Sequence, residues 1–354
     1  MKKILKNIIA NLILLLVGFM SSFIILELFL RLPICSSKYT LASFHKYNPI
    51  QETLNDNYNV FRPSAICGYE HIPNSAPKGK RPIVTSFINS YGMVGKEYGL
   101  KKNKNTFRIL ILGDSITEFD WYVDGLRQRF NSGRALGYDF ELWNGGVLGY
   151  AVNQYWDYFK YRGIRYNPDM LFIGFCLNDF TCDSYIVCYK DAKGFTQYYY
   201  PSPNLQRIIP TNRLLFRHSY LYRFLTVKLE TLLSQLHQNG EDSDARVKTG
   251  LYFLSKIKKL CDDKKIPLFC VIFPYLKPLS EYDRNQMDDY NSMLIVLEKL
   301  GIDYLDLHLY FPESKRYDLR NNKSDDMHPS REGHEIAASA IYSHLIKNYF
   351  SGDI

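Results

Sequence analysis

One serine in the sequence stands where it could take part in chemistry. Ser115 follows the apolar run at residues 107–112, which Gly113 and Asp114 end. A short apolar run of this kind predicts a buried parallel strand, and such strands deliver side chains to the carboxyl edge of a sheet. Because a serine hydroxyl is a weak nucleophile alone, Ser115 requires a base, a group that orients the base, and donors for a developing oxyanion.

A base and its orienting group stand near the end of the chain. His328 precedes a proline and the start of a predicted helix, so we expect it on a loop at the edge of the domain. Asp325, three residues earlier, can turn back and accept a hydrogen bond from the imidazole. Asp326 competes for this role, but the greater separation of Asp325 from His328 gives the chain more room to turn back and form the hydrogen bond. An isolated Asp-x-x-His sequence is also typical of a solvated, capped turn, and its position after the predicted strands favours catalysis.

Three neutral donors follow three predicted strands. The backbone N–H of Ser115 lies after the first strand, and that of Gly149 lies in a glycine-rich turn predicted at residues 144–149 after the second. The side-chain amide of Asn178 follows the strand at 170–175. One such donor stabilises a tetrahedral intermediate by about 3–4 kcal/mol. These three groups are therefore the candidate oxyanion donors.

Strands and helices alternate from about residue 105 onward, which predicts an α/β domain built from βαβ units. Strands are predicted at 107–112, 140–143, 170–175, 267–273 and 302–307. Helices are predicted at 123–130, 155–161, 246–261, 285–300 and 331–349. Residues 182–243 interrupt this alternation with a tyrosine-rich loop and a helical stretch at 214–236, which indicates an insertion over the sheet edge or the site.

The N-terminal residues predict a membrane anchor. Three lysines precede residues 8–26, nineteen uncharged and mostly apolar residues that are about long enough to span a bilayer. The lysines favour a cytoplasmic N-terminus, with the bulk of the protein outside the cytoplasm. A cleaved signal peptide is the alternative, but no small-x-small cleavage site follows, so an uncleaved anchor is favoured. Glu27 and Arg31, four residues apart at its outer end, can pair.

The chain thus divides into three predicted parts. Residues 1–33 form a cytoplasmic tip and transmembrane anchor, residues 34–105 an irregular or β-rich linker and collar, and residues 106–354 the α/β domain with its insertion. In the collar, residues 83–88 predict a strand and residues 89–92 a turn.

Composition excludes several other classes of protein. The net charge of +8 comes from scattered lysines and arginines without a basic-aromatic motif, which disfavours a nucleic-acid partner. The seven cysteines lack the spacing of a zinc site, so no metal or organic cofactor is expected. Neither a Gly-x-Ser-x-Gly sequence nor a phosphate-binding loop is present, which disfavours a typical α/β-hydrolase and a nucleotide-binding protein.

Four stretches, in this order along the chain, resemble the sequence blocks of the SGNH, or GDSL-type, hydrolases. They are residues 113–115, 144–149, 178–179 and 325–328. The resemblance implies a flavodoxin-like three-layer α/β/α sandwich with a central parallel sheet. Two positions depart from the family pattern, because Phe119 and Cys176 stand where glycine is common. We expect these changes to reshape the pocket without removing a catalytic group.

The resemblance also implies roles for the candidate residues. Ser115 would be the nucleophile, Asp325 and His328 would complete a triad, and Gly149 and Asn178 would donate to the oxyanion. Residues 89–98 and the anchor resemble membrane-tethered bacterial members of the family, many of which act on acyl groups of cell-surface glycans.

The resulting hypothesis is a membrane-anchored, extracytoplasmic serine esterase or acyl transferase. Its substrate would be an acylated small molecule or glycan, with O-acetyl groups of cell-surface glycans among the esters. The alternative is a catalytically inactive module with the SGNH fold that binds glycan or a partner in an envelope-assembly complex.

Overall fold

The computed structural model describes most of the chain as two compact units. The described residues are 2–32, 60–64, 66–76, 87–132, 137–180, 187–190, 196–199, 212–236 and 243–350. The smaller unit draws on residues 1–55 and 185–239, and the larger on residues 56–184 and 240–354. The three-part division of the chain stays a prediction, and the described part of the collar shares the unit of the sheet.

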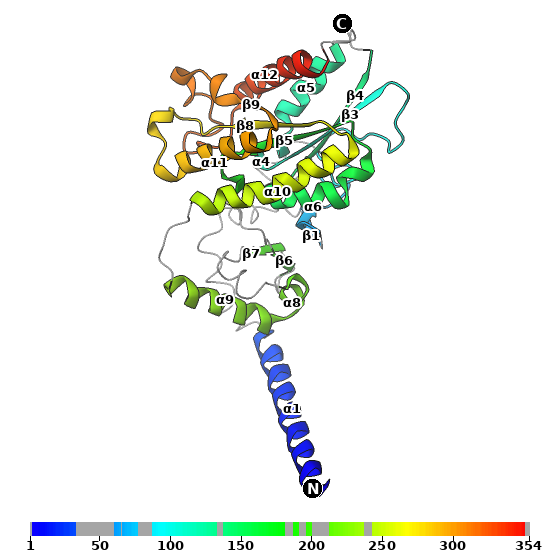
Figure 1. Ribbon diagram of the computed structural model, residues 1–354, viewed down its shortest axis with the longest axis vertical. Helices are drawn as coiled ribbons and strands as arrows, with labels where there is room; N and C mark the ends of the chain where they lie inside the picture. The colour runs from blue at the N-terminus through cyan, green and yellow to red at the C-terminus, as the bar shows by residue number, and fades with distance from the viewer. Residues whose placement is uncertain are drawn as a thin grey trace. The chain divides into compact units, whose positions relative to one another are not determined.

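A five-stranded parallel sheet forms the centre of the larger unit (Figure 1), with the strand order β4-β3-β5-β8-β9. The strands are β3 (Thr106–Gly113), β4 (Asp139–Gly146), β5 (Met170–Cys176), β8 (Leu268–Phe273) and β9 (Asp303–Asp306). In order along the chain this is 2-1-3-4-5, the flavodoxin-like order, whose switch point lies between its first and third strands. β3 and β5 therefore flank the position where such sheets build their sites.

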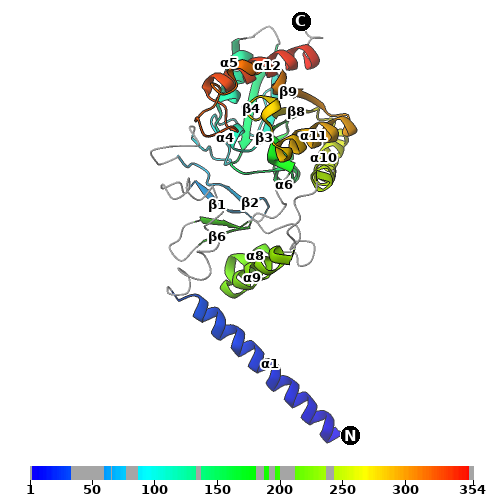
Figure 2. The ribbon, with the colours of Figure 1, turned by 90° about the vertical axis from the view of Figure 1, so that its left-hand side faces the viewer.

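Helices cover both faces of this sheet (Figures 1 and 2). On one face α5 (Trp121–Ser132) packs against α12 (Arg331–Tyr349). On the other face α10 (Ser243–Lys264) packs against both α6 (Val152–Tyr161) and α11 (Arg284–Leu300). The predicted three-layer α/β/α sandwich is confirmed, and each predicted helix and strand from residue 105 to residue 180 and after residue 243 is present.

Several short elements complete the larger unit. An antiparallel hairpin of β1 (Phe61–Ser64) and β2 (Gly68–His71) precedes the sheet, and α4 (Ser115–Glu118) follows β3. The 3-10 helices are η2 (Gly163–Tyr166), η3 (Leu177–Phe180), η4 (Leu279–Glu281), η5 (Leu307–Leu309) and η6 (Glu313–Lys315). The predicted turn at residues 89–92 is confirmed, whereas most of the strand predicted at residues 83–88 lies outside the described residues.

Two predictions from the sequence need correction. β4 continues to Gly146, so residues 144–146 are strand rather than turn, and the turn begins only at Val147. The reason is that β3 continues to Gly113, which pairs with Gly146 and so keeps residues 144–146 of β4 in the sheet. The helical stretch at 214–236 is two helices, α8 (Arg213–His218) and α9 (Tyr220–Leu236). The insertion also contains an unpredicted hairpin of β6 (Val187–Lys190) and β7 (Thr196–Tyr199).

Three glycines lie in register across the carboxyl ends of neighbouring strands. Gly113 of β3 pairs with Gly146 of β4 and with Gly174 of β5. The fully buried Thr117 side chain lies over this row, and a Cβ on Gly113 would be 1.9 Å from its Oγ1 and 2.9 Å from the Gly174 oxygen. A Cβ on Gly174 would lie 2.9 Å from the same Oγ1. The absence of three side chains thus lets α4 approach the edge of the sheet closely.

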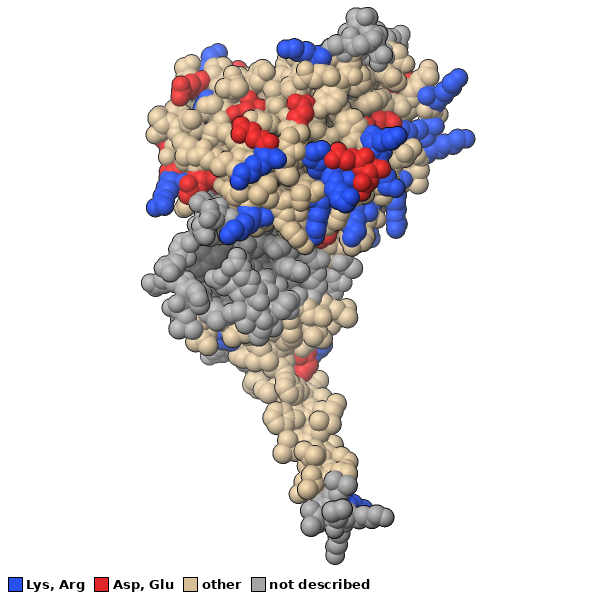
Figure 3. All heavy atoms as spheres, in the orientation of Figure 1, with Lys and Arg blue, Asp and Glu red and all other residues tan. Residues whose placement is uncertain are grey.

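The smaller unit contains α1 (Lys2–Leu30), within which Lys6–Leu30 is long and apolar enough to cross a membrane. The middle of α1 carries no charged side chain (Figure 3). At the C-terminal end of α1, Arg31 Nε donates to Glu27 Oε1 over 2.9 Å, which confirms the predicted pair.

The glycine row generates a prediction about stability. We expect Gly113→Ala to lower the free energy of unfolding by about 1–3 kcal/mol, because the new methyl group overlaps Thr117 and the Gly174 carbonyl. Gly99→Ala is the matched control, since the nearest atom to a Cβ there is 3.8 Å away. Chemical denaturation of the purified variants measures the difference. Equal stabilities of the two variants would contradict the close approach.

Candidate active site

A serine, a histidine and an aspartate meet at the carboxyl edge of the sheet. Ser115 Oγ lies 2.7 Å from His328 Nε2, although the two residues are 213 positions apart. His328 Nδ1 lies 2.7 Å from Asp325 Oδ2. The structure therefore brings the three predicted residues into one continuous chain of contacts, in which one imidazole links a hydroxyl to a carboxylate.

The loop before α12 forms around the Asp325 carboxylate. Asp325 Oδ1 accepts hydrogen bonds from the backbone N–H groups of Met327 and His328 at 3.0 and 3.1 Å. Asp326 instead directs its carboxylate to Lys277, with 3.6 Å between Oδ2 and Nζ. Asp325 and not Asp326 is therefore the residue that contacts the imidazole.

The same contact sets the protonation of both partners. Burial lowers the pKa of His328, but the hydrogen bond and negative charge of Asp325 outweigh it, so that this pKa is raised above its ordinary value. For Asp325, burial raises the pKa, and the hydrogen bond and charge of His328 outweigh this effect and lower it. The geometry thus favours an ionised Asp325 beside an imidazole that binds a proton readily.

Ser115 begins α4 and is buried at the end of β3. Asp114 caps this helix, since its Oδ1 accepts from the Ile116 N–H at 2.9 Å. Its other oxygen lies 3.1 Å from Ser115 Oγ, which is longer than the 2.7 Å contact of that hydroxyl with His328. Burial raises the pKa of Asp114. The hydroxyl has one proton, and the shorter contact directs it toward His328.

The other two predicted donors follow the strands on either side of β3. Gly149 lies in the turn after β4 with φ +72°, a left-handed conformation that favours glycine. Asn178 lies in η3, directly after β5. Within η3, the fully buried Asp179 accepts from the Cys176 N–H at 3.1 Å and from the Tyr155 hydroxyl at 2.8 Å. These bonds hold η3 against α6.

The sequence did not indicate a second group of residues that holds the turn of Gly149. Glu118 and His71 have completely buried side chains, and Glu118 Oε1 lies 2.5 Å from His71 Nε2. The other Glu118 oxygen accepts from the Leu148 N–H at 2.8 Å, and the Tyr69 hydroxyl donates to the Leu148 carbonyl oxygen. Both backbone polar groups of Leu148, the residue before Gly149, are therefore hydrogen-bonded. No sequence signal could identify the pair, because 47 residues separate its members.

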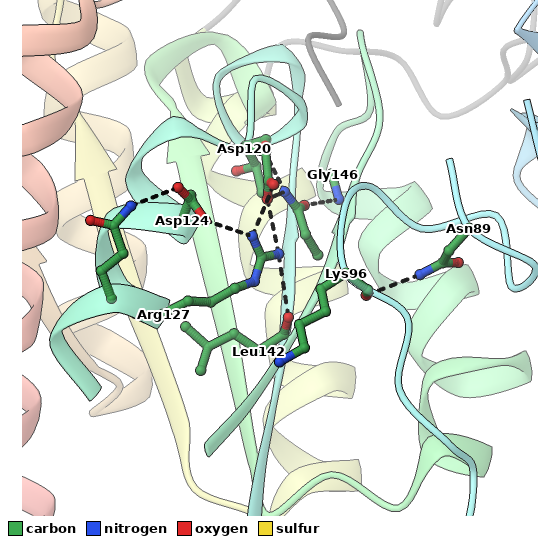
Figure 4. A network of polar contacts seen from close by, with 10 residues as sticks. Asn89, Lys96, Asp120, Asp124, Arg127, Leu142 and Gly146 are labelled. Atoms are coloured by element: carbon green, nitrogen blue, oxygen red, sulfur yellow. Dashed lines mark hydrogen bonds and ion pairs between the residues drawn. The ribbon is translucent and has the colours of Figure 1, made fainter. Parts of the chain in front are cut away.

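A network of polar contacts joins the end of α4 to the end of β4 (Figure 4). The Asn144 amide donates to the Thr117 carbonyl oxygen and to Asp120 Oδ1, both at 2.8 Å, and its oxygen accepts from the Gly146 N–H at 2.9 Å. Arg127 binds the two oxygens of Asp120 at 2.9 and 3.0 Å. The asparagine of the second sequence block therefore positions the backbone around Ser115.

A polar groove lies next to the side of the site that His328 occupies. The buried Phe119 ring contacts the His328 ring edge-on at 5.7 Å between centroids and the Trp121 ring at 4.8 Å. Trp121 lines a groove of about 630 Å³ that carries amide, carboxylate and guanidinium groups. Its lining residues are Asp120, Trp121, Asp124, Gly125, Gln128, Arg331, Glu332 and Glu335.

The chain is similar to known hydrolases. The profile of the GDSL-like Lipase/Acylhydrolase family matches residues 111–336, more than half of the chain. A search of curated protein sequences finds no match. Among solved structures, a catalytic mutant of the acetylxylan esterase Axe2 from Geobacillus stearothermophilus is 16% identical, with a TM-score of 0.43, over 69% of this chain and 96% of that one. A GDSL-like lipase from Bacteroides thetaiotaomicron is 13% identical, with a TM-score of 0.39, over 71% and 92%.

The family match includes the end of β3, Ser115 and the loop of His328, and these segments meet at the edge of the sheet. The chain is therefore a carboxylic ester hydrolase that belongs to the GDSL-like lipase/acylhydrolase family.

Proposed function

We propose that this hydrolase cleaves or transfers ester-linked acyl groups with Ser115, His328 and Asp325 as its catalytic triad. The observation that carries the proposal is the pair of 2.7 Å contacts that join the three side chains. Neutral His328 accepts the Ser115 proton while Oγ bonds to the ester carbonyl carbon, and the imidazolium then returns this proton to the departing alcohol. Water or a sugar hydroxyl next takes the acyl group from the serine, with His328 again as the base.

The backbone N–H groups of Ser115 and Gly149 and the side-chain amide of Asn178 would receive the negative oxygen of the tetrahedral intermediate. Their support is positional, since the three residues follow β3, β4 and β5, which are adjacent in the sheet. All three donors are neutral. They therefore add no further charge beside the Asp325–His328 pair.

The proposed substrates are acyl esters of cell-surface glycans, including O-acetyl groups, encountered outside the cytoplasm by a protein that α1 anchors. The apolar helix and the lysines before it support this location. The groove beside Trp121 supports a hydrophilic alcohol, because its amide, carboxylate and guanidinium groups can hydrogen bond to sugar hydroxyls. The resemblance of residues 89–98 to membrane-tethered bacterial members of the family supports the glycan.

A fluorophosphonate serine probe tests the triad directly. We expect the intact protein to be labelled, Ser115→Ala to be unlabelled, and His328→Ala to react about 10²–10⁴-fold more slowly because the base is lost. Ser324→Ala, which removes an exposed hydroxyl near the same loop, is the matched control and should label normally. Failure of the intact protein both to label and to hydrolyse aryl acetates would support the inactive alternative.

The pH dependence of catalysis follows from the contact between Asp325 and His328. Only the neutral imidazole accepts a proton, so kcat/KM should rise with pH through the pKa of His328, which lies above the ordinary 6.5. Asp325→Asn removes the charge that stabilises the imidazolium, so the midpoint of this rise should move to lower pH while the rate falls. Asp326→Asn is the matched control, since Asp326 faces Lys277, and should leave the midpoint in place. Equal shifts in both variants would argue against Asp325 as the orienting residue.

Substitution of Glu118 tests whether the turn that contains Leu148 and Gly149 contributes to the stabilisation of the oxyanion. As a positioning residue that acts through Leu148, it should affect kcat more than KM, and Glu118→Ala should lower kcat by up to about 10²-fold. Glu118→Gln keeps an oxygen acceptor for the Leu148 N–H and should recover much of this loss. Glu97→Ala removes another carboxylate that accepts a backbone N–H, on the exposed collar, and serves as the control. Identical kcat losses in the Gln and Ala variants would rule out this role.

A further inference from the structure

The outer end of α1 is bound to the start of α9 through Glu27. The Glu27 carboxylate accepts from the Ser219 hydroxyl at 2.8 Å and from the backbone N–H groups of Tyr220 and Leu221 at 3.0 and 2.8 Å. Arg31 donates to the His218 carbonyl oxygen at 2.9 Å. A carboxylate from one helix thus caps the N-terminus of the other, where backbone N–H groups have no partner within their own helix.

The position of Glu27 along α1 places this junction relative to a membrane. The nineteen uncharged residues 8–26 precede it. At a rise of about 1.5 Å per residue they span about 28 Å, close to the hydrocarbon thickness of about 30 Å. With α1 across the bilayer, Glu27 therefore lies at the outer hydrocarbon boundary. Since the first residues of α9 are bound to its carboxylate, α9 begins at the same level.

α9 runs across the axis of α1 and not along it, as both views of this unit show (Figures 1 and 2). A helix that crosses a membrane-spanning helix in this way extends along the plane of the membrane. Because α9 extends in this direction, all seventeen of its residues lie near the membrane level at which the helix begins.

An apolar stripe on α9 begins beside α1 and continues beyond it. Leu221, Leu225 and Leu232 lie on one helical face, being four and seven residues apart. Leu221, next to the junction, is only 8% exposed, whereas Leu225 and Leu232 are 50% and 55% exposed. Lys228 shares this face, and its Nζ lies 5.9 Å from the Phe224 ring centroid, so that its long side chain can reach water past an apolar surface. Exposed leucines on one face are typical of a helix at a lipid interface, where the long side chain of a lysine among them can extend to water.

We propose that α9 binds the outer surface of the membrane, with Leu225 and Leu232 at the boundary between headgroups and acyl chains. This inference rests on the proposed anchoring by α1. The insertion then provides a second membrane contact, fixed to the anchor by Glu27. In the neighbouring α8, Leu214 and Leu215 are also exposed, at 65% and 48%.

Photolabelling of the full-length protein in vesicles tests the proposal. The vesicles contain phosphatidylcholine, phosphatidylglycerol and a phospholipid with a diazirine on its acyl chain near the headgroup. After irradiation, mass spectrometry of peptides should find lipid adducts on α1 and on α9, concentrated at residues 225–232. The double variant Leu225→Asn and Leu232→Asn should lower the α9 adducts about tenfold and leave those on α1 unchanged. Both leucines are exposed, so these substitutions leave the packing of the unit intact.

Leu309→Asn is the matched control, because Leu309 is 80% exposed and belongs to the other unit. It should not change the labelling of α9. Adducts on α1 without adducts on α9, or α9 adducts that persist in the double variant, would overturn the interfacial contact. Absence of adducts on α1 would instead contradict the proposed anchor.

Discussion

The close approach of α4 to the ends of three strands is the constraint on which the position of Ser115 and the candidate site depends. Gly113, Gly146 and Gly174 lie in register, and Thr117 occupies the space that their side chains would need. Because Thr117 and Ser115 belong to the same helical turn, the depth of the threonine determines the position of the serine hydroxyl. Close packing of this kind does not adjust continuously, so a hydroxyl held in this way has little freedom to move.

Hydrogen bonds from the collar stabilise the turn that follows β4. A turn that leaves a sheet loses the partners of its backbone groups, and buried N–H and C=O groups without partners are costly. Residues before the sheet contribute to these contacts. The Tyr69 hydroxyl donates to the Leu148 carbonyl oxygen, and His71 pairs with Glu118 of α4, whose other oxygen accepts from the Leu148 N–H at 2.8 Å. The collar is therefore part of the architecture of the site.

Environment separates the acidic residues near Ser115 into two kinds. Asp114 and Asp179 are fully buried, and burial raises the pKa of both, Asp179 most strongly. They act as acceptors for backbone and tyrosine donors and hold local structure. Asp325 is more accessible and is bound to His328, and its pKa is lowered. An ionised acid thus stands beside the His328 imidazole, an arrangement that stabilises an imidazolium.

The local patterns of the sequence determined the parts of this protein that depend on neighbouring residues. Apolar runs and helical periodicity predicted the elements of the α/β domain, nineteen uncharged residues predicted α1, and Asp-x-x-His placed a base and its partner in one loop. Such patterns report burial, period and capping, which are properties of short segments.

Tertiary structure decided the strand order, the choice of Asp325 over Asp326, and the pairing of His71 with Glu118. It also decided the extension of β4 to Gly146 and the capping of α9 by Glu27. In most of these cases the partners come from distant segments, where no spacing rule relates one residue to the other. Asp325 and Asp326 are adjacent, and only the path of the loop around one carboxylate distinguishes them. Contacts of this kind form when packing brings whole elements together, so the sequence named the chemical groups while the fold decided which of them meet.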